Sequence, residues 1–143
     1  MSRKFGVTAA CVILAATAST GLALTFDDVA IEYWAGSGAN RAVTVVDFGS
    51  GSAAFGYRWD GSATSWDMLL AVDAAGGMDM KYTMWDFGGF LIPAVDEISY
   101  DGKVATSDWL NSFLGYWGSA DGETWTPHGT GVGGRVLTDG AWD

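Results

Sequence analysis

The chain has 143 residues, a length typical of one domain. It carries 17 acidic residues against seven basic ones, a formal net charge of -10. This acidity excludes a protein that binds the phosphate backbone of nucleic acid, and the single cysteine excludes a disulfide scaffold. Hydrophobic residues make up 49% and aromatic residues 14% of the chain, enough apolar surface to form a core.

The first 23 residues are typical of a secretory signal peptide. Arg3 and Lys4 precede an uncharged run over residues 5–24 that is rich in aliphatic and small side chains. Ala18 and Ala23 each end a small-x-small pattern, so we expect cleavage after one of them. A retained N-terminal anchor is the alternative, because about 20 apolar residues can just span a bilayer.

Cleavage after Ala23 leaves residues 24–143 as one β-rich domain. This mature chain keeps all 17 acidic residues and five basic ones, a net charge of -12. Its one cysteine is gone, because Cys11 lies in the signal peptide. We expect an exported protein of the periplasm, cell surface or extracellular space, with no membrane span in the mature chain and no nucleic-acid partner.

Short runs of β-branched and aromatic residues, separated by Gly-rich or Asp-Gly breaks, predict a mainly β chain. One packed helix is predicted near residues 65–75: Ser62 to Ser65 offer N-cap side chains, Asp67 lies in the first turn, and Gly76 ends it. The predicted fold class is therefore mainly β (α+β), an antiparallel sheet or sandwich with one packed helix. Strands are expected at 29–34, 42–48, 53–59, 79–87, 95–100, 113–117, 124–126 and 135–137.

Residues suited to catalysis are few. His128 is the one histidine and is expected in an exposed loop, and zinc needs several His or Cys ligands. Residues 129–134 match G-x-G-x-x-G, but a strand is expected after them, which argues against a dinucleotide site. We predict that the chain is not an enzyme. The 14 aspartates and three glutamates leave a carboxylate-pair hydrolase as an alternative.

Calcium is the one cofactor that the composition suggests. Asp101, Asp121 and Glu123 lie in or beside Asp-Gly turns, where carboxylates and loop carbonyls can serve as oxygen ligands. A solvated acidic surface explains the same residues. We therefore expect no cofactor, with calcium as the alternative.

The eight tryptophans are the most informative excess in the composition. Aromatic side chains build either a compact core or a platform for a sugar ring or a planar molecule such as a tetrapyrrole. We predict that Arg58, Trp59, Asp60 and Trp142 form or border a ligand site.

The scarce arginines are expected to find carboxylate partners, because a half-buried guanidinium normally pairs with one. Arg58 has Asp67, Asp47 and Asp139 as candidates. Arg135 has Asp139. These pairs are predicted to be structural ion pairs.

Several segments of the mature chain resemble a known family. Residues 56–61 read GYRWDG and continue into Ala63-Thr64 and Asp67-Met68-Leu69. Three further segments, at residues 33–47, 116–118 and 135–143, complete the set. Together they resemble a family of secreted bacterial envelope proteins that is often recognised by PEP-CTERM sorting tails. The resemblance implies an exported β-rich domain and supplies no established catalytic residues.

We therefore predict an exported, non-enzymatic binding or interaction module of the bacterial cell envelope. Its partner is expected to be a glycan, a planar small molecule or an envelope protein. Three alternatives remain: a structural or accessory subunit of a larger envelope or membrane complex, a calcium-stabilised domain, and a carboxylate-pair hydrolase.

Overall fold

A computed structural model describes residues 23–108, 110 and 112–143. Strands account for 45% and helices for 15% of these described residues, which confirms the predicted mainly β, α+β class. The predicted signal peptide lies outside the described residues, except for Ala23. Within the described part of the chain, no helix is long and apolar enough to cross a membrane.

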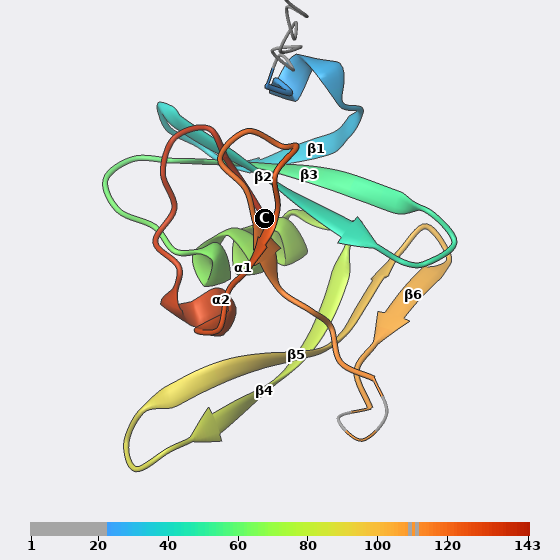
Figure 1. The fold of residues 1–143 in the computed structure, drawn as a ribbon, viewed down its shortest axis with the longest axis vertical. Coiled ribbons are helices and arrows are strands. Elements are labelled where there is room, and N and C mark those ends of the chain that lie inside the picture. The colour runs from blue at the N-terminus through green and yellow to red at the C-terminus, as the bar shows by residue number, and fades with distance from the viewer. Residues whose placement is uncertain (1–22, 109, 111) are drawn as a thin grey trace, which may run out of the picture.

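The first sheet has four strands in the order β1-β3-β2-β9 (Figure 1). Its centre is the antiparallel pair β2 (Asn40–Asp47) and β3 (Ser52–Trp59), which align over their full length. The flanking strands, β1 (Ile31–Gly36) and β9 (Ala141–Trp142), are parallel to β3 and β2, respectively. The sheet is therefore mixed, a feature that the strand pattern did not predict.

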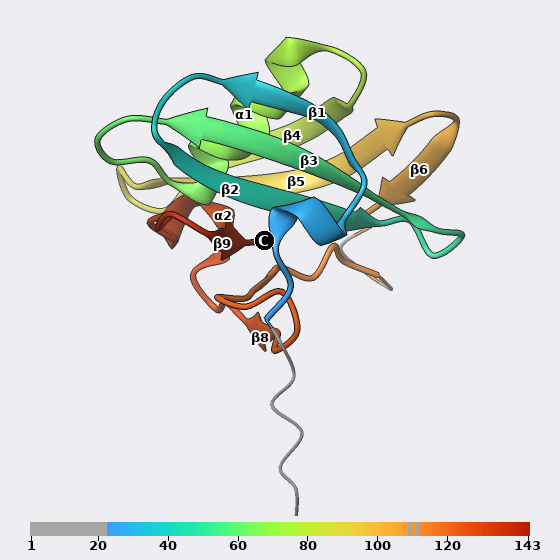
Figure 2. The same cartoon turned by 90° about the horizontal axis from the view of Figure 1, so that it is seen from above.

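Both faces of this sheet are covered. Ala42 and Val46 of β2 lie in a core cluster with helix α1, whereas Val43 lies in a second cluster with Trp142. Figure 2 shows the short helix η1 (Phe26–Asp28) on the side of the sheet opposite α1. Burial on both faces explains why β2 and β3 read as nearly continuous apolar runs rather than as a strict alternation.

The predicted helix is confirmed as α1 (Ser65–Ala75), and it ends at Gly76. Thr64 is its N-cap. The Thr64 side chain accepts a hydrogen bond from the backbone N–H of Asp67, and the Asp67 carboxylate accepts one from the backbone N–H of Thr64 at 2.7 Å. Met68 and Val72 are fully buried, so the cap fixes where the buried face of α1 begins.

Replacing Thr64 with alanine is expected to lower the free energy of unfolding by about 1 kcal/mol, because the cap loses its side-chain acceptor. Urea denaturation measures the change. The control is Ser62→Ala, an exposed position just before the cap, for which we expect less than about 0.5 kcal/mol. Equal effects at both positions would show that the Thr64 cap contributes nothing specific.

The second sheet is antiparallel, with β4 (Asp79–Asp86), β5 (Leu91–Tyr100) and β6 (Lys103–Thr106) in that order. Its inner half packs on the first sheet: Phe55 and Tyr100 make an edge contact with ring centroids 4.9 Å apart. The outer half of the β4–β5 hairpin extends away from the rest of the molecule (Figure 1). Phe87 and Phe90 at its tip are 62% and 77% exposed.

The last third of the chain contains little regular structure. It holds β7 (Trp117–Gly118), β8 (Thr126–Pro127) and the short helix α2 (Gly131–Gly134). The predicted strand at 113–117 is wrong except at Trp117, and the strand at 135–137 is reduced to one bridge between Val136 and Thr64. The composition of residues 113–116 suits a strand, but in the described part of the chain they pair with no strand, and propensity alone does not form one.

Candidate functional site

The two tryptophans of the predicted ligand site belong to the core. Trp59 is 5% exposed and stacks on Tyr57, with ring centroids 5.4 Å apart. Trp142 is 3% exposed and packs edge-on against Phe26. Their indole faces are covered by the protein itself, so neither can serve as a ligand platform at the surface. The sequence alone does not distinguish a tryptophan in the core from one that forms a ligand platform.

The neighbours of Trp59 also have local partners. The Arg58 guanidinium lies over the indole of Trp34, 4.9 Å from its centroid, which is a cation–π contact rather than the predicted ion pair. Asp60 accepts a hydrogen bond from the backbone N–H of Ala39 at 3.0 Å. Asp67, a predicted partner of Arg58, caps α1 instead. Residues 58–60 and 142 line neither the cavity described below nor a second hollow beside Gly118 and Arg135.

Arg135 has a carboxylate partner, but it is Asp143 rather than the predicted Asp139. Nε of Arg135 lies 3.0 Å from Oδ1 of Asp143, and their side chains are 13% and 1% exposed. The Asp139 carboxylate accepts a hydrogen bond from the backbone N–H of Arg41 at 2.8 Å. Because a Cβ on Gly118 would overlap the guanidinium, the glycine provides the space that Arg135 occupies.

The Asp143 carboxylate is also the end of a buried hydroxyl chain. The Tyr116 hydroxyl donates to Oδ2 of Asp143 at 2.6 Å and lies 2.6 Å from Oγ of Ser65. A phenol has one proton, so Ser65 is the donor in the second contact. Burial, together with the hydrogen bond to Asp143, raises the pKa of Tyr116 well above its usual value of 10. Tyr116 therefore stays protonated at any physiological pH.

His128 contacts both Arg135 and Tyr116. Its Nε2 is 2.5 Å from Nη1 of Arg135. A guanidinium can only donate, so Nε2 of His128 is the acceptor in this contact. The contacts of His128 are thus with Arg135 and, through ring packing at 5.6 Å, with Tyr116.

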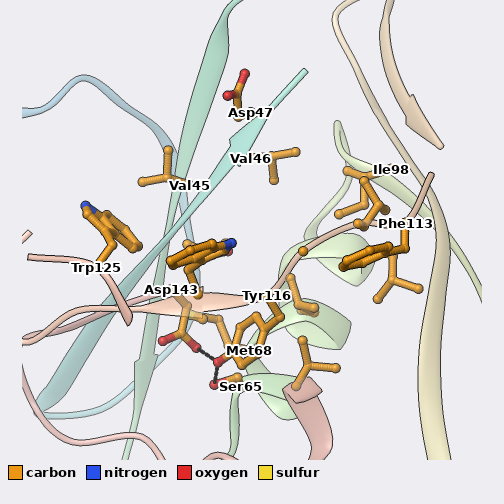
Figure 3. A pocket seen from close by; sticks show the side chains of 17 residues that line it. Val45, Val46, Asp47, Ser65, Met68, Ile98, Phe113, Tyr116, Trp125 and Asp143 are labelled. Carbon is orange, nitrogen blue, oxygen red and sulfur yellow. Dashed lines mark hydrogen bonds between the residues drawn. The ribbon is translucent and has the colours of Figure 1, made fainter. Parts of the chain in front are cut away.

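A cavity of about 600 Å³ lies above these hydroxyls (Figure 3). It is bounded by β2, by the first turns of α1, by β5 and by residues 113–117. Ser65, Tyr116 and Asp143 form its polar end, and Phe113 and Trp117, 74% and 48% exposed, lie where it meets solvent. The walls are largely apolar; they include Val45, Val46, Met68, Ile98, Phe113 and Trp125.

One atom at the polar end has no hydrogen bond. Among the described residues, Oδ1 of Asp143 is the buried side-chain oxygen that accepts none, because the nearby Nε–H of Arg135 is close enough for charge pairing but poorly aligned. Buried acceptors are nearly always satisfied. This oxygen is out of contact with solvent and lies against the Arg135 guanidinium, so the ion pair, and not a group in the cavity, is its partner.

The residues predicted to bind calcium do not converge. Asp101 lies in the turn between β5 and β6, whereas Asp121 and Glu123 lie between β7 and β8. In the described residues, no group of three or more His, Cys, Asp or Glu side chains is arranged to hold a metal ion. Asp121 instead stabilises its own turn, because its carboxylate accepts the backbone N–H groups of Glu123 and Thr124, at 2.9 and 2.8 Å.

These N–H groups, with the Ser119 hydroxyl, lower the pKa of Asp121 from 3.8 to about 2. A lowered folded-state pKa stabilises the fold above the unfolded pKa, and this contribution is lost as the pH falls from about 4 to about 2. We therefore expect Asp121→Asn to lower the melting temperature at pH 7 and to have a smaller effect near pH 2. Asp101→Asn, which removes only a surface ion pair with Lys103, is the control. If Asp121→Asn lowers the melting temperature by the same amount at both pH values, the charge of Asp121 does not stabilise the fold.

The sequence did not point to Ser65, Tyr116 or the cavity. Tyr116 lies in the segment of the resemblance at residues 116–118, and Asp143 lies in the separate segment at residues 135–143. Comparisons of the chain with protein-family models, with curated proteins and with solved structures gave no significant match.

Proposed function

We propose that this chain is an exported, non-enzymatic binding module of the bacterial cell envelope, and that the cavity beside β2 is its binding site. The observation that carries this proposal is the cavity itself: about 600 Å³, with apolar walls and one fixed polar end. Ligand sites typically have volumes of this size and combine an apolar lining with a few placed polar groups.

The lining favours an apolar partner group over a glycan. Met68, Ile98 and Phe113 offer no hydrogen bonds, whereas a sugar needs a partner for most of its hydroxyls. Among the predicted partners, this supports a planar small molecule or an apolar protein segment.

The polar end also supports a binding role rather than catalysis. Ser65 donates a hydrogen bond to Tyr116, and Tyr116 is held in its neutral form beside Asp143. A serine nucleophile needs a base that takes its proton, and His128 contacts Arg135 instead. The location in the envelope rests on the signal-like N-terminus and on the family resemblance.

Titration with N-phenyl-1-naphthylamine, a neutral amine that carries one naphthyl and one phenyl group and whose emission rises in apolar surroundings, tests the proposal. We expect saturable binding at one site. Val45→Phe, which puts a ring into the cavity wall, should weaken the affinity by about tenfold or more, equal to about 1.4 kcal/mol.

The matched control is Val104→Phe. Val104 lies on β6, is 52% exposed and is not part of the cavity wall, so the same change there should leave the affinity unaltered. No saturable binding, or equal loss in both variants, would exclude the cavity as the binding site.

A further inference from the structure

Strand β2 is longer than its partner β9. The two strands pair at Ala42 with Ala141 and at Val43 with Trp142, and the last hydrogen bond joins the N–H of Val45 to the carbonyl of Asp143. Beyond this point β2 continues to Asp47, and its residues from Thr44 onward line the cavity. One edge of β2 therefore faces the cavity and not another strand in the described residues.

The hydrogen bonds between β2 and Asp143 determine which backbone groups of β2 point toward the cavity. Asp143 donates to the carbonyl of Val43, and Val45 donates to the carbonyl of Asp143, so these two β2 residues direct their backbone groups toward β9. Backbone direction alternates along a strand. The carbonyl of Val45 and the N–H of Asp47 consequently point to the cavity, as the next acceptor and donor of the same parallel ladder.

The cavity suits the side chains of such a strand. Successive side chains of an added strand would point to opposite sides. In Figure 3, Met68 and Ile98 lie on one side of the space beyond β2, and Trp125 lies on the other. Residues 113–116, which form no strand ladder, make the opposite wall.

We infer that the cavity is a strand-addition site, which binds an extended apolar peptide segment of a partner protein parallel to β2 and in line with β9. This inference rests on the proposed function, since it names the ligand class of the same site. Continuity with the existing β2–β9 ladder favours a peptide over a flat small molecule, because only a peptide offers both an N–H and a carbonyl at the required spacing. With Asp47 and Asp143 in the lining, the favoured segment carries no acidic side chain.

The test compares two variants at one position. Asp47→Pro removes the N–H that faces the cavity, while Asp47→Ala keeps it and equally loses the side-chain bond to the N–H of Gly49. Proline is compatible with the β2–β3 pairing, since the residues that bond to β3 alternate with those that bond to β9.

The probe is the peptide acetyl-Thr-Val-Thr-Val-Thr-amide, titrated by calorimetry into the full chain. We expect binding that Asp47→Pro weakens by about three- to tenfold relative to Asp47→Ala, the worth of one neutral hydrogen bond. A peptide methylated at every backbone nitrogen should not bind the unaltered chain.

The outcomes separate this inference from the proposed function. Binding of N-phenyl-1-naphthylamine without binding of the peptide overturns strand addition and leaves the cavity as a small-molecule site. Failure of both ligands overturns both proposals. Peptide binding that is equal in the two variants, or that survives N-methylation, overturns pairing with β2. If Asp47→Pro does not fold, the methylated peptide on the unaltered chain decides the question.

Discussion

Asp143→Ala will lower the free energy of unfolding by about 3–5 kcal/mol, as expected when one partner of a buried ion pair is removed. The change leaves the Arg135 guanidinium, 13% exposed, without its carboxylate. It also removes the acceptor of the Tyr116 hydroxyl. Urea denaturation followed by tryptophan fluorescence measures the loss.

The control separates the unpaired charge from lost packing. Replacing both partners, Arg135→Met with Asp143→Leu, removes the charges together and should recover a large part of the stability, because apolar residues of similar volume often replace a buried pair at little cost. A double variant no more stable than Asp143→Ala would show that packing, and not the unpaired guanidinium, causes the loss.

Phe55→Ala will destabilise the chain by a similar amount, about 3–5 kcal/mol. Phe55 is fully buried and contacts the rings of Tyr33 and Tyr100, with centroids 5.3 and 4.9 Å away. It therefore joins the two sheets next to the cavity. Phe90→Ala, at the 77% exposed hairpin tip, is the control and should change the free energy of unfolding by less than about 0.5 kcal/mol.

The Phe55 variant also bears on binding. Ile98 and Val95 of β5 form one cavity wall, and β5 is attached to β3 partly through the contact between Phe55 and Tyr100. Without the contact between Phe55 and Tyr100, β5 should be held less firmly. We therefore expect the folded Phe55→Ala protein to bind N-phenyl-1-naphthylamine more weakly. Unchanged affinity together with a large loss of stability would show that the wall is held in place by other contacts.

The elements that local chemistry determines were predicted well. Helix α1 was predicted with its end, and with its cap Thr64 among the N-cap candidates at residues 62–65, because Thr64, Asp67 and Gly76 act on the backbone within a few residues. The central strands β2 and β3 were also predicted, because they are neighbours in the sequence and a short hairpin turn joins them. The parallel strand β9 could not be predicted in this way, since β2 and β9 lie far apart in the sequence and β9 pairs at only two positions.

The candidate site was mostly missed for the same physical reason. Ser65 and Tyr116 are 51 residues apart, and Tyr116 and Asp143 are 27 apart, so no local pattern brings them together. The excess of tryptophan was recognised, but composition does not distinguish an indole buried like Trp142 from one at a cavity rim like Trp117. Arg135 was correctly expected to find a carboxylate, and only the partner differed.

Mapping the bound probe by amide chemical shifts tests the binding cavity most directly. In a ¹H–¹⁵N spectrum of the full chain titrated with N-phenyl-1-naphthylamine, the largest shifts are expected at the amides of Val46, Asp47, Met68 and Tyr116, which line the cavity. Shifts concentrated instead on the exposed hairpin at residues 84–92, with the cavity amides unmoved, would contradict a binding site beside β2.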